Sequence, residues 1–209
     1  MSETIRVEVY PRSTREIEEL EYEVYVNAGY ILPDKIRRVR ENDDYPEHNI
    51  VAVYCDDLLV GSVRLVVDSH PEDSLFSLRC FEHFDIWPWA RRLLCEAPAN
   101  RLMQVGTMVI REEYRSGFVF QAMFKRALEM LLHERIHFAV ATIDEGLYNR
   151  LGSRKIPFVP MGETIHYMGS RTVPALVSRE WLISGVVPDD ILSISEFYSN
   201  KTRAALHSA

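Results

Sequence analysis

The order of the predicted elements indicates a mixed α/β (α+β) fold, in which helices cover a β-sheet. Residues 50–67 read as two apolar strands around the acidic turn Asp56-Asp57, which is the pattern of a β-hairpin. Residues 102–110 read as a buried strand that leads through a turn into an amphipathic helix and then a further strand. A strand meander followed by such β-α-β units folds into a mixed sheet with helices on its faces.

The elements before the hairpin are a strand, a helix and a loop. Residues 5–10 alternate apolar and polar side chains, as a half-buried strand does. Ser13 followed by Glu16 is a capping box, and it predicts a helix that runs to about Gly29. The polar and charged residues 33–46 predict a mobile loop.

The elements after the hairpin begin with residues 76–89, which carry many aromatic side chains without a clean period. The others, in chain order, are the strand at 102–110, a turn at 113–117, a helix to about 131, a strand at 136–142, a short helix at 147–151, strands at 156–161 and 165–169, and a helix that begins after Pro188. We find no linker between them, so we expect residues 1–209 to form a single domain.

The composition narrows the function classes. A net charge of −7 argues against a nucleic-acid partner, because no basic stretch is dense enough to follow a phosphate backbone. No run approaches the roughly 18 apolar residues that a membrane span needs. The chain has 3 cysteines, without metal-site spacing, which suits a reducing compartment. We therefore expect a cytoplasmic protein without a membrane span.

Two local clusters of basic residues are compatible with either solvated surface charge or a docking site for an acidic carrier protein or nucleotide phosphates. Their members are Lys35, Arg37, Arg38 and Arg40, and Arg91, Arg92 and Arg101.

The segment EYRSGFVFQAMFKRALEML (113–131) resembles the turn and helix at which GNAT acyltransferases hold a donor's pantetheine and phosphates. A helix N-terminus suits phosphate because its N–H groups are unpaired and its dipole end is positive. The family's turn carries several glycines, whereas here only Gly117 is present. A turn with few glycines resembles that of a narrower branch of the family, the acyl-homoserine lactone synthases and the N-acyl amino acid synthases.

Other segments resemble the same branch, so the likeness spans roughly positions 15 to 170. They are VYVNAGYI (24–31), NDDYP (42–46), GSVRL (61–65), the aromatic segment 76–89 with its FEHFD, and YNRLG (148–152). The resemblance implies a GNAT-like, mostly antiparallel central sheet with helices on both faces. It also implies an N-acyltransferase that moves an acyl chain from a pantetheine thioester to the amine of an amino-acid-like acceptor. The donor substrate would be acyl-CoA or acyl-carrier protein, with no permanently bound cofactor.

The resemblance also assigns residues. Tyr148 would act as the general acid for the leaving thiolate, although a core aromatic is nearly as common at such a place. The residues expected to line the donor site are Val105, Met108, Val109, Arg115, Gly117, Phe118 and Val119. Those expected at the acceptor and acyl chain are Arg64, Asp43, Tyr30, Phe81, Phe84 and Trp87. Arg64 would hold an acceptor carboxylate with its guanidinium fork, or else pair with an acid of the protein itself.

The central strand departs from the branch. Its glutamate, followed three residues later by an arginine, is replaced here by Gln104 and Thr107. A carboxamide can hydrogen-bond to an amine but cannot take its proton. Either the base lies elsewhere, with Glu163 and His166 as candidates, or the substrate differs, or the protein is a catalytically silent relative that binds a thioester or a partner protein.

The segment HERIH (133–137) matches the H-E-x-x-H pattern of zinc proteases, which needs both histidines on one continuing helix. The residues after His137 read as a strand, so we expect the helix to end near Glu134 or Arg135. A zinc hydrolase is therefore a third and weaker hypothesis, and no metal site is expected.

Overall fold

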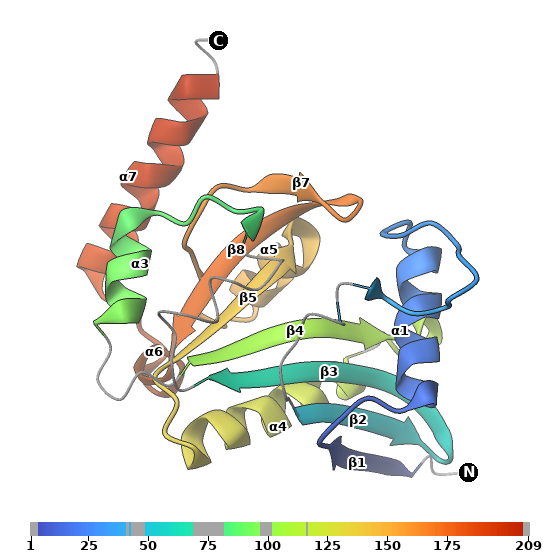
Figure 1. Cartoon of the computed structure of the whole chain (residues 1–209). Helices are drawn as coiled ribbons and strands as arrows, with labels where there is room; N and C mark the ends of the chain where they lie inside the picture. The colour runs from blue at the N-terminus through green and yellow to red at the C-terminus, as the bar shows by residue number, and fades with distance from the viewer. Residues whose placement is uncertain are drawn as a thin grey trace. The chain divides into compact units, whose positions relative to one another are not determined.

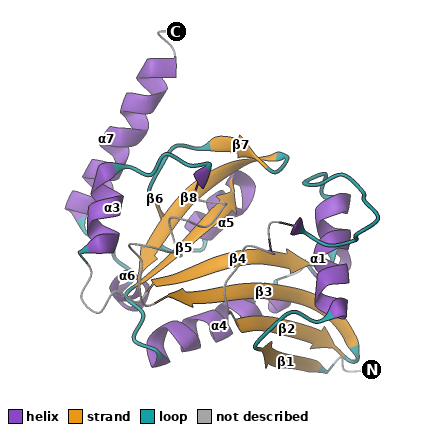
Figure 2. Ribbon diagram, in the orientation of Figure 1, coloured by secondary structure: helices purple, strands orange, loops and turns teal. Residues whose placement is uncertain are grey.

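The computed structural model describes residues 4–40, 42, 49–68, 82–96, 102–115 and 117–206. The chain falls into two compact units. The first unit comprises Met1–Val67 and Met103–Glu134, and the second comprises Asp68–Leu102 and Arg135–Ala209. Each unit combines helices with antiparallel strands, which confirms the predicted mixed α/β class (Figures 1 and 2). A single domain stays a prediction. No helix in the described ranges is long and apolar enough to cross a membrane.

The strands of the first unit form a sheet in the order β1-β2-β3-β4, with β1 at its edge. Its elements in chain order are β1 (Ile5–Tyr10), α1 (Arg15–Asn27), β2 (Asn49–Cys55), β3 (Leu58–Asp68), β4 (Leu102–Ile110), the short 3-10 helix η3 (Glu112–Tyr114) and α4 (Phe118–His133). The pairs β1–β2 and β2–β3 are antiparallel, so the predicted hairpin is confirmed.

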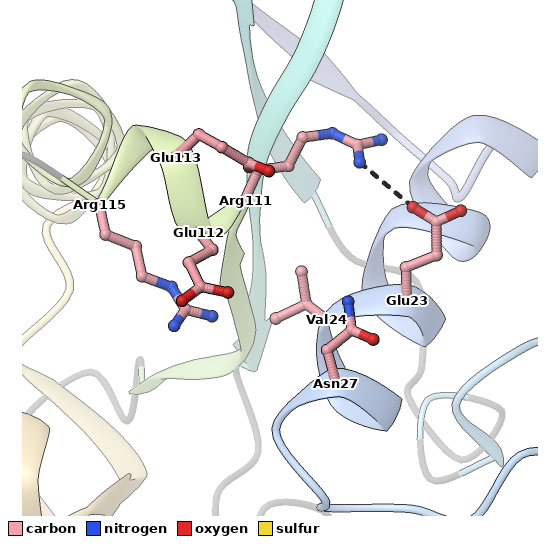
Figure 3. A pocket seen from close by; sticks show the side chains of 7 residues that line it. All are labelled: Glu23, Val24, Asn27, Arg111, Glu112, Glu113 and Arg115. Atoms are coloured by element: carbon pink, nitrogen blue, oxygen red, sulfur yellow. Dashed lines mark hydrogen bonds and ion pairs between the residues drawn. The ribbon is translucent and has the colours of Figure 1, made fainter.

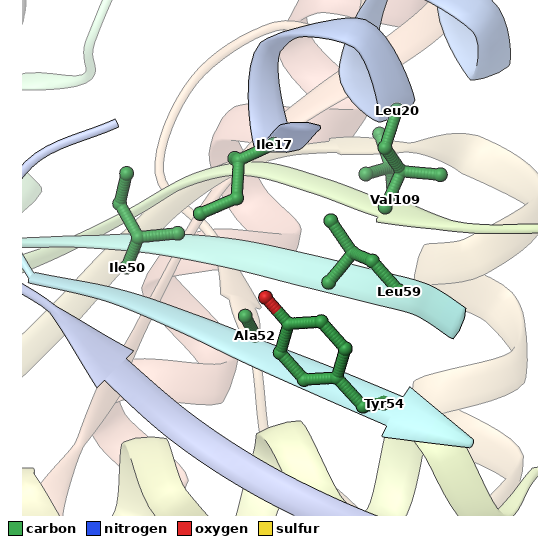
Figure 4. Packing of buried hydrophobic residues seen from close by; sticks show 7 residues of the cluster. All are labelled: Ile17, Leu20, Ile50, Ala52, Tyr54, Leu59 and Val109. Carbon is green, nitrogen blue, oxygen red and sulfur yellow. The ribbon is translucent and has the colours of Figure 1, made fainter. Parts of the chain in front are cut away.

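Helices α1 and α4 cover opposite faces of this sheet. Ile17 of α1 packs with Ile50 of β2 and Leu59 of β3 in one buried apolar cluster (Figure 4). On the other face, a Cβ at Gly61 would lie 2.6 Å from the Val119 side chain. Glycine therefore lets the first turn of α4 approach β3 closely.

The start of α1 corrects the predicted capping box by one residue. Thr14, and not Ser13, is the N-cap, and its side chain accepts from the N–H of Ile17 at 3.4 Å. Both hydroxyl residues suit a cap, and Thr14 has the extended backbone from which the first turn can start.

A β-bulge in β3 sets which side chains face α1. The register places Gly61 opposite Val53 but Leu59 opposite Tyr54, so Val60 is the extra residue. The N–H of Arg111 bonds to the Val60 carbonyl at 2.9 Å, and its Nε bonds to the Leu59 carbonyl at 2.9 Å. Arg111 thereby fastens the end of β4 to the bulge.

The second unit is built around strand β8, which lies between β5 and β6. Its described elements in chain order are α3 (Pro88–Cys95), β5 (Phe138–Asp144), α5 (Glu145–Ser153), β6 (Val159–Pro160), β7 (Ile165–Tyr167), β8 (Ser170–Ser178), α6 (Arg179–Ser184) and α7 (Asp189–Leu206). β7 also pairs with β8, and all these pairings are antiparallel. The predicted C-terminal helix and the strand after α4 are confirmed, although β5 begins two residues later than expected.

Strand β8 is not among the strands expected from the sequence, and it has Pro174 in its middle, although proline is rare in a central strand. The structure shows how the proline is accommodated. The N–H of Met161 bonds to the Pro174 carbonyl at 2.9 Å, and the return bond from residue 174 is missing because proline has no N–H. The Met161 carbonyl instead accepts the N–H of Trp87 at 2.8 Å. The aromatic segment therefore completes the hydrogen bonding of the sheet.

Gly162, next to this bond, provides the first prediction. A Cβ there would lie 2.6 Å from the backbone oxygen of Asp85 and 3.0 Å from the Pro174 ring. Gly162→Ala is therefore expected to lower the free energy of unfolding by about 1–3 kcal/mol, measured by urea denaturation.

The matched control is Gly152→Ala in α5, where a Cβ meets nothing within 4 Å. This change is expected to raise stability by about 0.5–1 kcal/mol, because alanine favours the helix. Equal effects of the two substitutions would contradict the assigned contact.

Candidate functional site

A buried ion pair lies at the centre of the first unit, between α1 and β3. The Nε of Arg64 donates to one oxygen of Glu21 at 2.8 Å, and its Nη2 donates to the other at 2.7 Å. The two side chains are 3% and 1% exposed, respectively. Nη2 also donates to the Ser13 hydroxyl at 3.1 Å. The bidentate fork therefore joins the start and middle of α1 to the sheet.

The ion pair continues into a hydrogen-bond chain that reaches β4. The side-chain amide of Asn42 donates to Glu21 at 2.8 Å. The hydroxyl of Thr107, on β4, donates to the Asn42 oxygen at 2.5 Å. Thr107, which stands where the resemblance leads one to expect an arginine, thus binds Asn42 of the loop after α1.

Residues 33–40 of the loop after α1 make several hydrogen bonds, and the mobility expected for residues 33–46 stays a prediction. The Tyr22 hydroxyl accepts the N–H of Asp34 at 2.8 Å and donates to its carbonyl at 3.0 Å. The Asp34 carboxylate accepts the N–H groups of Ile36 and Arg37 at 2.9 and 3.0 Å. These backbone bonds, with the guanidinium of Arg40, lower the pKa of Asp34.

Burial dominates the electrostatics of Glu21. Removal from water raises the pKa of its carboxyl, while Arg64 and Asn42 act in the opposite direction. The guanidinium and the amide are therefore what allows a carboxylate to exist in this position. The sequence prediction that Arg64 holds an acceptor carboxylate stays a prediction, and the carboxylate that its fork meets in the structure is Glu21.

The residues predicted for the donor site lie along β4 and at the start of α4, on either side of η3. Gly117 is the N-cap of α4 and has φ of 116°, a conformation that favours glycine. The first N–H groups of α4 have no side-chain cap, which suits an anion. Arg115, exposed beside them, donates from Nε to the Ile110 carbonyl at 3.2 Å.

The other predicted donor residues divide by exposure. Val109 and Val119 are buried in the core, while Val105, Met108 and Phe118 are half-buried. Only the backbone of the two buried valines is thus suited to meet a ligand.

A cavity of about 90 Å³ opens beside this turn (Figure 3). It is lined by Glu23, Val24, Asn27, Arg111, Glu112, Glu113 and Arg115. Arg111 donates to Glu23 at 3.2 Å, which joins β4 to α1 at its rim. Of these residues only Arg115 was expected at a site. Arg111 could have been predicted as a site residue, because it is the first charged residue after a buried strand.

Gln104 and Tyr30 also belong to the first unit. Gln104 is buried in β4 at 2% exposure. Tyr30 is half-buried after the end of α1, where its ring meets that of Tyr25 edge-on at 5.4 Å.

The second unit carries the predicted general acid and two of the acyl-chain residues. The Tyr148 hydroxyl, on α5, donates to the Phe158 carbonyl at 3.2 Å, and burial raises the pKa of its phenol. Phe84 is buried with its ring 5.4 Å from that of Tyr167.

Trp87 stacks on Tyr198 of α7 with ring centroids 5.6 Å apart. This ring contact and the backbone bond to Met161 therefore fix the start of α3. The predicted Asp43 and Phe81 lie outside the described residues.

The two histidines of HERIH do not share one helix, as expected, because His133 is the last residue of α4 and His137 lies just before β5. α4 ends at His133, and β5 begins at Phe138 after the left-handed residue Arg135. Within the described ranges, no group of three metal-ligating side chains occurs. Of the two candidate bases, Glu163 is half-buried and His166 is exposed.

Comparison with known proteins identifies the relatives. The family model of the N-acyl amino acid synthase FeeM matches residues 16–179. The solved structure of FeeM from uncultured soil microbes superposes on this chain with a TM-score of 0.61 and a sequence identity of 13%. The match covers 94% of this chain and 99% of FeeM. No curated protein matches the sequence.

Two further structures confirm the predicted GNAT-like fold. The CoA-dependent acyl-homoserine lactone synthase BjaI, with SAM and isopentyl-CoA, is 15% identical with a TM-score of 0.58, covering 86% of this chain and 78% of that one. An acyl-CoA N-acyltransferase from Pseudomonas aeruginosa is 12% identical with a TM-score of 0.51, covering 84% and 99%.

The buried ion pair provides the second prediction. Arg64→Leu is expected to lower the free energy of unfolding by about 3–5 kcal/mol, because it leaves Glu21 buried without its guanidinium. The double variant with Glu21→Leu should recover most of this loss, measured by urea denaturation at neutral pH.

The pH dependence and a surface control complete this test. Burial raises the pKa of Glu21, so its carboxyl becomes neutral as the pH falls. The loss of stability caused by Arg64→Leu should therefore shrink at lower pH. Arg171→Leu breaks the exposed pair with Glu145 and should change stability very little. A penalty independent of pH would show that the carboxyl is not its cause.

Proposed function

Because the chain belongs to the family of the N-acyl amino acid synthase FeeM, we propose that it moves an acyl chain from a pantetheine thioester to the amine of an amino-acid-like acceptor. The observation that carries this proposal is the family match over residues 16–179, which spans β4, α4 and α5. It makes the chain an acyltransferase of the N-acyl amino acid or acyl-homoserine lactone synthase type.

The donor is proposed to follow β4 to the start of α4. Its thioester carbonyl would receive backbone N–H groups of residues 105–110, which stabilise the developing oxyanion. Its phosphate would lie at the uncapped first turn of α4, beside the exposed Arg115. The neighbour BjaI, solved with isopentyl-CoA, supports a thioester donor of this class.

A carrier protein is proposed as the form of the donor, with coenzyme A as the alternative. The basic residues of the loop after α1 support it, because Lys35 and Arg38 are exposed beside Arg37. Arg37 itself lies over the Tyr22 ring at 5.5 Å and is held there. Such a basic surface suits an acidic carrier.

The chemical step forms one bond and breaks one. The acceptor nitrogen attacks the thioester carbon, a C–N bond forms, and the C–S bond then breaks. The departing thiolate is proposed to take the proton of Tyr148, whose raised pKa keeps the phenol protonated well above neutral pH. Glu163 or His166 would take the proton of the amine, because Gln104 cannot.

The proposed function is tested by product formation. Purified protein incubated with acyl-carrier protein or acyl-CoA and mixed amino acids is expected to yield N-acyl amino acids, detected by mass spectrometry. The preferred donor should give the higher kcat/KM, and added salt should raise KM for the carrier protein more than for acyl-CoA. Tight thioester binding without any product would overturn the catalytic proposal and favour a silent relative.

Tyr148→Phe tests the general acid. The variant is expected to lower kcat by about 10²- to 10⁴-fold with little change in KM, because it removes the proton and keeps the ring. In the unaltered protein, deprotonation of the Tyr148 phenol should lower kcat only above pH 10.0, since burial raises its pKa from that value.

Tyr198→Phe, on α7, is the matched control and should leave kcat unchanged, because its ring contact with Trp87 is kept. Full activity of Tyr148→Phe would assign Tyr148 to the core alone.

A further inference from the structure

The edge strand β1 presents an apolar strip to solvent. Ile5, Val7 and Val9 are 47%, 39% and 36% exposed. They share one face of the strand, since they lie opposite Cys55, Val53 and Val51 of β2, while Arg6 and Glu8 lie on the other face. Regularly spaced apolar side chains on a sheet edge favour pairing with another strand.

The backbone of the same residues faces the open edge. The N–H of Asp56 bonds to the Thr4 carbonyl at 2.8 Å, so Thr4 directs its backbone groups at β2. Antiparallel pairing alternates, so Arg6, Glu8 and Tyr10 do the same and residues 5, 7 and 9 direct theirs outward. Among the described residues β1 pairs with β2 alone.

The sequence of β1 is complementary to itself when read antiparallel. Outward-facing residues must pair with one another, so a symmetric pair is centred on residue 6, 7 or 8. Centring on Arg6 or on Glu8 places like charges opposite each other. Centring on Val7 places Arg6 opposite Glu8 twice and Ile5 opposite Val9 twice. Only this register combines opposite charges with matched apolar pairs.

The chain around β1 fits this register. Pairing centred on Val7 extends from Thr4 to Tyr10, and Pro11, which cannot donate to a ladder, lies just beyond it. Within one chain Arg6 already pairs with Glu8 and lies over the Tyr54 ring at 4.2 Å. Both charged groups are therefore held on the face where a second copy would meet them.

We propose that two copies of this chain associate through β1, antiparallel and centred on Val7, with Arg6 of each copy opposite Glu8 of the other. The occupant of the exposed strip is thus a second copy of the same strand. The apolar strips of the two copies join on one face of the extended sheet, and the charged pairs join on the other.

Sedimentation velocity of the full chain across micromolar concentrations tests the proposal. The unaltered protein is expected to show a concentration-dependent monomer–dimer equilibrium that weakens with salt. Arg6→Glu gives strands with two acids, and Glu8→Arg gives strands with two bases. Each is expected to weaken self-association by about tenfold or more, because like charges then meet twice.

Mixing the two single variants gives the decisive result. Their strands are complementary, so the mixture is expected to form a heterodimer, seen by native mass spectrometry, although neither variant dimerises alone. Each variant has also lost its own Arg6–Glu8 pair, so recovery on mixing cannot come from restored folding. Arg15→Glu, a charge reversal on the exposed start of α1, should dimerise like the unaltered protein.

Three outcomes would overturn the proposal. In the first, the unaltered protein is folded by circular dichroism but monomeric at all concentrations. In the second, both charge-reversal variants dimerise as well as the unaltered protein. In the third, the mixture of the two variants stays monomeric. The second outcome would place the interface elsewhere, and the third would exclude the pairing of Arg6 with Glu8 between copies.

Discussion

The first unit depends on the buried pair between Glu21 and Arg64. Two charges removed from water are tolerated only because each has hydrogen-bond partners. The carboxylate accepts from a guanidinium fork and an amide, and the guanidinium donates to the carboxylate and a hydroxyl. Since the partners come from α1, the following loop and β3, the pair fixes the position of all three. Thr107 extends the arrangement to β4, the strand on which the acyl group is proposed to lie.

The sequence predicts those elements of the fold whose periodicity is strong, and it fails where long-range bonds replace it. The hairpin, β4 and α4 follow from the hydrophobic pattern and the turn residues, and the C-terminal helix follows from the acids after Pro188. β8 does not follow from such signals, because Pro174 argues against a central strand and the compensating bond from Trp87 joins residues distant in sequence. The short α3 was hidden by the same aromatic segment.

The candidate site was predictable in kind but not in its partners. The motifs located Arg64, Arg115 and Tyr148, yet nothing in them says which carboxylate meets Arg64, because Glu21 is 43 positions away. One signal was present. Glu21 lies between Leu20 and Val24 on the buried stripe of α1, and a charge on an apolar stripe needs a partner. The buried carboxylate of the first unit thus lies on a helix, at Glu21 of α1, whereas β4 carries the uncharged Gln104.

The hydrogen bond from Trp87 to Met161 has a consequence for how the sequence can diverge. Any residue other than proline at position 174 would bring its own N–H to the Met161 carbonyl and compete with that of Trp87. Position 174 therefore governs whether the aromatic segment stays attached to its sheet. Over evolutionary time the two sites should change together, so that a homologue without this proline reshapes the region before α3 as well.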